Sequence, residues 1–199
     1  MIKKAKENPI ISPGLFSSYN KIYNHGFIFE NGIYHLFCRV VKKNGVSEIV
    51  LFISKDGLEF KEKKTVLSPS FKIDTHGVED PRITKINDSY MMTYTAYDGL
   101  TDRLCVATST DLENWKKHGE ALLSWDARMA ESFTVPWDKA QLTKEAEIHW
   151  VKSGGIFSRS IDNKFLMLFG DRNIYWAESP DGFKWHTNAK PFIRPRKGF

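Results

Sequence analysis

The stretch Phe27-Ile-Phe-Glu-Asn-Gly-Ile-Tyr-His-Leu-Phe-Cys-Arg39 places the turn pair Asn31-Gly32 between two apolar segments. An Asn-Gly pair in this position is a strong signal for a β-hairpin, because both residues accept positive φ angles. The same arrangement recurs in Ile83-Thr-Lys-Ile-Asn-Asp-Ser-Tyr-Met-Met-Thr-Tyr-Thr95 and in residues 155–170, around Asp162-Asn163. The chain is therefore predicted to repeat one hairpin unit three times.

Each hairpin is followed by another strand-like segment and then by an ending with a constant pattern. An Asp lies two residues after a Ser, and an aromatic residue lies four after the Asp. The three endings are Ser54-Lys-Asp-Gly-Leu-Glu-Phe60, Ser109-Thr-Asp-Leu-Glu-Asn-Trp115 and Ser179-Pro-Asp-Gly-Phe-Lys-Trp185. We expect each Asp to bond its own turn backbone and each aromatic ring to pack back on the sheet.

Three units of about four strands each predict an all-β chain built of β-propeller blades. The blades are expected at about 20–70, 77–125 and 150–199, within one partial propeller domain that has an insert at 125–150. A short helix is predicted at 139–147 in this insert, which is rich in helix formers. A β-sandwich is the alternative, but it would not require the same ending after every unit.

The number of blades has two further consequences. Closed propellers typically have 4–8 blades, and the chain stops at Phe199 without the turn residues of a finished unit, so it is expected to be cut off. The outward faces of the first and third blades would then be uncovered. Open faces and edges invite pairing, so self-association through these faces is expected.

Composition indicates a soluble globular protein. The 199 residues carry a net charge of +5, and the basic residues gather in short clusters that we interpret as solvated faces, since no nucleic-acid-binding motif accompanies them. Cys38 and Cys105 each lie in an apolar run and are expected to be buried free thiols. The sequence shows no metal-ligand spacing and no stretch that would span a bilayer, so we expect no metal, no cofactor, no membrane partner and a cytoplasmic location.

The segment Gly77-Val-Glu-Asp-Pro-Arg-Ile-Thr84 is the strongest candidate for chemistry. It sets two acids beside a guanidinium, and Pro81 restricts the backbone between them. A carboxylate held at the start of a strand, next to a charged donor, suits the binding of polar substrates and acid catalysis. The structural alternative is an ion pair at the edge of a strand.

This segment, followed by Tyr90-Met-Met-Thr-Tyr-Thr-Ala-Tyr-Asp98, resembles the signature of glycoside hydrolase family 130. Further similarity lies in Asn24-His-Gly26, in Arg39 at the end of the first hairpin, in Trp150-Val-Lys-Ser-Gly-Gly-Ile156 and in the closing Arg194-Pro-Arg-Lys-Gly-Phe199. The resemblance covers almost the whole chain. It implies a five-bladed β-propeller that acts on β-mannosides, by hydrolysis in some members and by phosphorolysis in others.

The resemblance also implies roles for single residues. Asp80 matches the catalytic acid, Asn24 and Arg39 match residues that bind the sugar in the −1 subsite, and Lys152 falls in the segment that borders the active site. Glu79 and Arg82 flank the acid and are expected to orient it. The structural alternatives are a turn cap for Asn24, a surface ion pair for Arg39 and a solvated side chain for Lys152.

Two departures from the family pattern bear on the reaction, the first on the acceptor of the glycosyl group and the second on whether the chain is active. Where phosphorolytic members carry a His-Arg pair, this chain reads Leu168-Phe-Gly-Asp171, and an acid there would repel phosphate. Where relatives often have Pro-Glu, it has Ser158-Arg159. We therefore expect an inverting hydrolase of β-mannosides or related oligosaccharides, with a β-mannoside phosphorylase and an inactive or sugar-binding propeller as the alternatives.

The partner of the acid and the aromatic contacts of the sugar are less determined by the sequence. Asp171 is expected at the substrate site, and the general base is Asp171, a loop acid such as Glu131, or a residue on the blades that this chain lacks. Tyr97, Trp125 and Trp137 are candidate platforms for a sugar ring, whereas Tyr94 lies mid-strand and is expected in the core.

Overall fold

The structure is a computed structural model that describes residues 4–126, 151–170 and 173–196. The predicted helix at 139–147, the candidate base Glu131, the aromatic Trp137 and the candidate site residue Asp171 lie outside the described residues. The described residues form strands with two short 3-10 helices, η1 (Pro13–Leu15) and η2 (Lys72–Asp74). None of these helices is long or apolar enough to cross a membrane.

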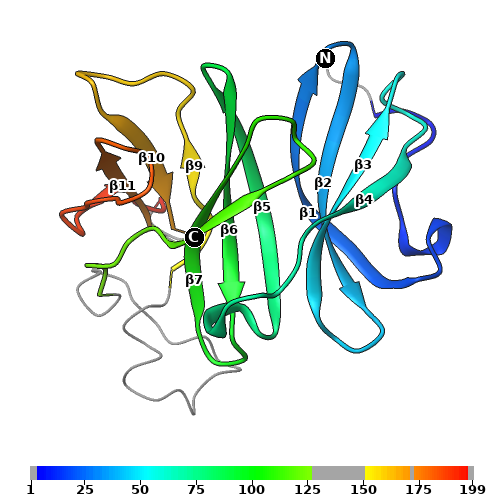
Figure 1. The fold of residues 1–199 in the computed structure, drawn as a ribbon, viewed down its shortest axis with the longest axis horizontal. Helices are drawn as coiled ribbons and strands as arrows, with labels where there is room; N and C mark the ends of the chain where they lie inside the picture. Colours follow the sequence, from blue (N-terminus) through cyan, green and yellow to red (C-terminus); the bar gives the residue numbers. More distant parts are fainter. Residues whose placement is uncertain (1–3, 127–150, 171–172, 197–199) are drawn as a thin grey trace.

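The strands form three antiparallel four-stranded groups, which Figure 1 shows fanned side by side. The first group comprises β1 (Tyr19–Glu30), β2 (Ile33–Lys42), β3 (Ser47–Ser54) and β4 (Lys61–Leu67). The second comprises β5 (Gly77–Ile86), β6 (Ser89–Tyr97), β7 (Asp102–Ser109) and β8 (Lys116–Glu120). The third comprises β9 (Gly155–Ile156), β10 (Phe165–Phe169), β11 (Ile174–Ser179) and β12 (Pro191–Ile193). We call them the first, second and third blades.

Each blade is a meander in which every strand pairs with the next along the chain. The pair Ser47 and Gly77 joins β3 to β5 in parallel and so connects the first two blades at one corner. The three blades confirm the predicted all-β fold as part of a β-propeller, and the described residues show no face-to-face sandwich. The residue limits predicted for the blades, and their grouping in one partial domain, stay predictions.

The blades are held together by apolar side chains that alternate along the strands. Between the first and second blades the buried cluster includes Phe37, Ile49 and Met92. It also contains Tyr94, which is fully buried, as its mid-strand position predicted. Because every second side chain faces one neighbour and the rest face the other, a middle blade must be apolar on both faces. This requirement explains the nearly continuous burial of β6.

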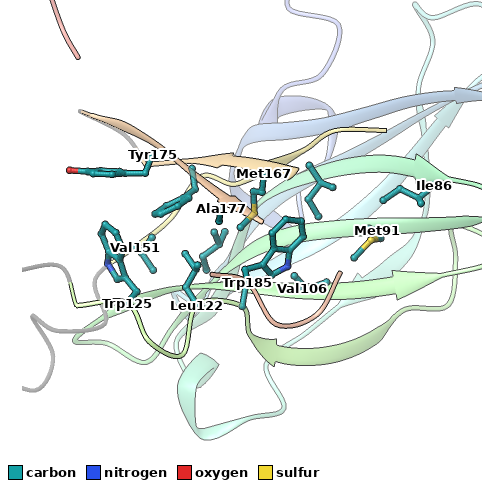
Figure 2. Packing of buried hydrophobic residues seen from close by; sticks show 14 residues of the cluster. Ile86, Met91, Val106, Leu122, Trp125, Val151, Met167, Tyr175, Ala177 and Trp185 are labelled. Atoms are coloured by element: carbon teal, nitrogen blue, oxygen red, sulfur yellow. The ribbon is translucent and has the colours of Figure 1, made fainter. Parts of the chain in front are cut away.

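The contact between the second and third blades corrects one prediction. Trp125 is only 5% exposed, and its ring meets those of Phe169 and Tyr175 at centroid distances of 5.1 and 5.2 Å. Figure 2 shows it in the same apolar cluster as Leu122 and Val151. The prediction that Trp125 is a sugar platform was therefore wrong. An indole ring next to a blade face buries a large apolar area, and this gain outweighs any preference for the loop surface.

The outer face of the first blade corrects a second prediction. Its buried cluster includes Cys38, Val50 and Phe52, and the N-terminal segment packs on it through Ile11 and Phe16. The rings of Phe16 and Phe52 meet edge to face at 4.9 Å. This face is therefore covered in part by the chain itself. Phe27 and Phe29 further along β1 remain about half exposed, as do Phe157 and Ile193 on the third blade. Self-association through such side chains stays a prediction.

The three blade endings have the predicted hydrogen bonds. In each, the Ser hydroxyl donates to the Asp two residues on, and that Asp accepts from two backbone N–H groups of its own turn. The indole N–H groups of Trp115 and Trp185 donate to carbonyls three residues back. The hydrogen bonds that each Asp accepts hold the pKa of Asp111 and Asp181 below the ordinary value and lower that of Asp56 to about 2.

Both cysteines are buried free thiols, as predicted. Burial raises the pKa of Cys38 to about 12 and also raises that of Cys105. Thiols with so little thiolate at neutral pH are inert, and their role is packing.

Candidate active site

Two β-bulges lie opposite one another on the first strands of the first and second blades. In β1, Tyr23 pairs with Arg39 and His25 pairs with Cys38, so Asn24 is an extra residue without a partner on β2. In β5, Glu79 pairs with Thr95 and Arg82 with Thr93, so Asp80 and Pro81 together oppose one residue of β6. A bulge redirects the side chain of its extra residue.

Both bulge residues adopt the left-handed backbone conformation. The φ angle is 47° at Asn24 and 52° at Asp80. Asn and Asp tolerate this region better than other non-glycine residues, although it still costs energy. Such strain persists only where surrounding contacts stabilise it, and it clusters at functional sites.

Gly26 lets the two bulges approach. A Cβ atom added to this residue would lie 2.7 Å from the carbonyl oxygen of Pro81, closer than real side chains come. This close approach of β1 to β5 therefore requires glycine at position 26. Figure 1 shows β5 next to the first blade.

The side chains of the two bulges meet, and Arg39 joins them from β2. Asn24 Nδ2 donates to Asp80 Oδ1 at 2.9 Å, and Arg39 Nη1 lies 3.3 Å from the same oxygen. Arg39 Nη2 donates to Glu79 Oε1 at 2.5 Å, and Arg39 Nε donates to Ser47 Oγ at 3.2 Å. The structure thus brings together four of the predicted residues, Asn24, Arg39, Glu79 and Asp80.

This arrangement treats the two oxygens of Asp80 differently. Oδ1 accepts both donors, whereas Oδ2 has no hydrogen-bond partner within the described part of the chain. The side chain of Asp80 is 13% exposed, so the group is shielded but not sealed. A carboxyl held by one oxygen can carry a proton on the other and present it to a bound molecule.

Glu79 has the most perturbed electrostatics of the group. Burial raises its pKa, and the negative charges of Asp102 and Asp80 raise it further, whereas Arg39 and the Ser47 hydroxyl act in the opposite direction. The two acids share one guanidinium. The positive charge of Arg39 is therefore divided between them.

Lys152 lies beside Asp102, an acid close enough to Glu79 to raise its pKa, and Asp102 was not predicted from the sequence. Lys152 Nζ lies 3.8 Å from Asp102 Oδ2, and the Asp102 carbonyl accepts the backbone N–H of Val151 at 3.0 Å. Asp102 is 6% exposed at the start of β7. An acid two residues before the apolar run Leu104–Val106 was a sequence signal, since buried acids need a partner.

Arg82 lies apart from the carboxyl groups. Its side chain is exposed, and its hydrogen bond in the described part of the chain runs to the carbonyl oxygen of Pro81 at 3.0 Å. Ser47 and Tyr23 are the other contacts of Arg39 that the sequence analysis missed. Neither has a motif of its own, because their role depends on strands that meet only in the folded chain.

Comparisons with known proteins identify the family of the chain. A family model described as beta-1,4-mannooligosaccharide phosphorylase, of glycoside hydrolase family 130, matches residues 7–199. A 1,2-beta-oligomannan phosphorylase from Thermoanaerobacter sp. (strain X514) is 28% identical, over 98% of this chain and 62% of the relative. A beta-1,2-mannobiose phosphorylase from the same strain is 35% identical, over 59% of this chain and 45% of the relative.

Solved structures are similar over the same extent. One belongs to work on GH130 mannoside phosphorylases and on glycoside hydrolases that target beta-1,2 mannosidic linkages in Candida mannan. It has a TM-score of 0.80 at 25% identity and covers 98% of this chain and 62% of that one. A putative glycoside hydrolase from Bacteroides ovatus ATCC 8483 has a TM-score of 0.78 at 27% identity, over 99% of this chain and 63% of that one.

The chain thus spans less than two thirds of the length of these relatives. Its fold is that of the solved structures, and the family model matches almost every residue. On this evidence the chain belongs to glycoside hydrolase family 130.

Proposed function

We propose that the chain supplies the catalytic acid of an enzyme that cleaves β-mannosides, with Asp80 in that role. The supporting observation is the convergence of Asn24 and Arg39 on one oxygen of Asp80, with Oδ2 left for the substrate. A proton on Oδ2 would pass to the glycosidic oxygen as its bond to the anomeric carbon breaks. Neighbouring Arg39 then stabilises the carboxylate that remains.

Arg39 and Asn24 have a second task in this proposal. A carboxyl at a strained bulge would otherwise sample several rotamers, and a misplacement of about 1 Å can cost on the order of 10²-fold in rate. Two donors from another blade fix its direction. Lys152, just before the third blade, and Asp102, in the second blade, would border the sugar.

The acceptor of the mannosyl group distinguishes two forms of the reaction. Hydrolysis requires a second carboxyl about 6.5–9.5 Å from the acid to activate water, with inversion at the anomeric carbon. An acid at position 171 favours this form, because it would repel phosphate. Phosphorolysis needs no such base, since phosphate is itself the nucleophile, and the names of the curated relatives favour it.

The test uses the protein as its gene encodes it, with β-1,2- and β-1,4-mannobiose as substrates and cellobiose as the matched control. Each substrate is incubated with and without inorganic phosphate, and mannose and mannose 1-phosphate are separated by anion-exchange chromatography. Mannose formed at equal rates in both conditions indicates hydrolysis. Mannose 1-phosphate that requires phosphate indicates phosphorolysis, and proton NMR of the first product reports inversion.

One result of this test would contradict the proposal. If a folded sample cleaves neither mannobiose in either condition, the proposal is wrong. Titration calorimetry with the same sugars would then show whether the protein is the sugar-binding propeller that the sequence analysis left as an alternative.

A further inference from the structure

Tyr23 lies under the guanidinium that organises the candidate site. Tyr23 and Arg39 are direct cross-strand partners of β1 and β2, and the guanidinium carbon of Arg39 lies 4.7 Å from the centroid of the Tyr23 ring. At this distance a cation is attracted by the face of the ring. Tyr23 also precedes the bulge residue Asn24 directly, so the same backbone segment carries both.

The contacts of Arg39 leave its guanidinium little freedom. Its three nitrogens are used by Ser47, Asp80 and Glu79, and the ring of Tyr23 covers one face. Hydrogen bonds in the plane fix where the group points. They resist tilting only weakly, since each tolerates some misalignment. The ring supplies the restraint perpendicular to the plane.

We propose that Tyr23 is a positioning residue, which acts through Arg39 to hold the Asp80 carboxyl in its productive direction; this inference rests on the proposed function. The phenol hydroxyl of Tyr23 is poorly suited to give up its proton. Burial raises its pKa, and although Arg39 lowers it, the negative charges of Glu79 and Asp80 raise it again. Tyr23 therefore stays neutral at physiological pH, and its ring face is the part that matters.

Two substitutions separate the ring from the hydroxyl. Tyr23→Phe keeps the ring face and should leave kcat/KM within about twofold. Tyr23→Leu removes the face and should lower kcat by roughly 2- to 30-fold, the range expected for a cation–π contact, with a smaller change in KM. Tyr34→Leu is the matched control, because Tyr34 packs on Phe29, 4.7 Å away, in a separate aromatic group of the same hairpin.

The pH profile distinguishes positioning from a loss of fold. When Arg39 is less well held, less positive charge faces the carboxyl pair, so the limb that reports loss of the essential proton should move to higher pH in Tyr23→Leu. Both Tyr23→Phe and Tyr34→Leu should leave that limb in place. In an Arg39→Met background, Tyr23→Leu should cost less than about twofold, because the two residues act as one unit.

A readout without turnover tests the contact itself. In a ¹⁵N-edited NMR spectrum, the Nε–H proton of Arg39 should be shifted upfield by the ring of Tyr23. Tyr23→Phe should retain this shift and Tyr23→Leu should abolish it. If the signal does not respond to Tyr23→Leu, the inference is wrong, even in a fully active enzyme. If it responds and kcat and the pH limb do not, Tyr23 contacts Arg39 without positioning the acid, which also overturns the inference. An absence of β-mannoside cleavage with an intact NMR response overturns the proposed function instead.

Discussion

Asp111 and Asp80 make similar contacts with opposite consequences. Asp111, in the ending of the second blade, accepts at Oδ1 from the backbone N–H groups of Glu113 and Asn114 at 2.9 and 2.7 Å. Asp80 also accepts two donors at Oδ1, but they are the side chains of Asn24 and Arg39, 56 and 41 residues away in the sequence. One carboxylate is satisfied by its own turn, and the other by a neighbouring blade.

The difference distinguishes a feature that stabilises every blade from one that belongs to the candidate site. The local arrangement occurs in all three endings with the same hydrogen bonds, so it is a feature of the blade. The distant arrangement combines two bulges, two left-handed residues and a required glycine at one place. Changes at the endings should therefore affect stability, whereas changes at the bulges should affect activity.

The largest effect is expected for Asp80→Asn. The amide keeps the size and most hydrogen bonds but has no acidic proton, so β-mannoside cleavage should fall by about 10²–10⁴-fold with an unchanged circular dichroism spectrum. Rates are measured with a mannobiose and with an activated aryl β-mannoside. The loss should shrink for the aryl substrate, whose leaving group needs little protonation. Equal losses on both would show that Asp80 only positions the sugar.

Gly26→Ala should have the next largest effect. Its Cβ would meet the Pro81 carbonyl at 2.7 Å, so β1 must move away from β5 and the contact of Asn24 with Asp80 is lost. We expect a loss of activity on the order of 10²-fold and about 1–3 kcal/mol of stability, measured by rates and urea denaturation. Gly155→Ala is the control, because its added Cβ would only approach the Leu168 carbonyl at 3.9 Å. Equal behaviour of the two variants would contradict the close approach.

Asp111→Ala should act on stability alone. Loss of the bonds to its turn should cost about 1 kcal/mol, by analogy with helix caps, and lower Tm by a few degrees, with kcat/KM unchanged. Since the pKa of Asp111 is lowered in the folded state, its contribution is present above the ordinary value of 3.8 and is lost as the pH falls below it. The gap in Tm to the parent protein should therefore close in acid. Asp88→Ala, in the exposed turn between β5 and β6, should show no such gap.

The smallest effect concerns Glu79 and the pH dependence of stability. Its folded-state pKa lies above the ordinary value of 4.5, so the folded state holds its proton more tightly than the unfolded state. The contribution of Glu79 to stability is thus greatest below 4.5 and falls as the pH rises through the raised pKa. Compared with Glu79→Gln, the parent protein should lose stability over this window in thermal denaturation. A constant difference between the two from acid to neutral pH would show that burial does not perturb Glu79.

Much of the fold could be predicted because its signals are local. The turns Asn31-Gly32 and Asp162-Asn163 have the positive φ angles that their residue types favour, and the endings bond as the Ser-x-Asp pattern predicts. Tyr94 was placed in the core by its position within a strand. Trp125 was placed wrongly, because a residue after the last strand of a blade carries no periodic pattern to show which way it packs.

The candidate site also has a part that could be predicted from the sequence and a part that could not. The motif around Asp80 identified Glu79 and Asp80, the family resemblance added Asn24 and Arg39, and the structure brings these four together. The sequence alone did not indicate that both donors meet one oxygen of Asp80, or that Ser47 and Tyr23 hold Arg39. It also placed Arg82 with the acid, whereas that side chain is exposed and bonds the Pro81 carbonyl.

The sequence by itself determined where strands turn and how each blade ends, because these features depend on hydrogen bonds and φ preferences within a few residues. Only the tertiary structure decided which carboxyl oxygen is held, which acid lies beside Lys152, and which tryptophan becomes core. Those outcomes depend on how closely two blades approach. That distance is set by packing across the interface, at Gly26 against Pro81 above all, between residues that lie far apart in the chain.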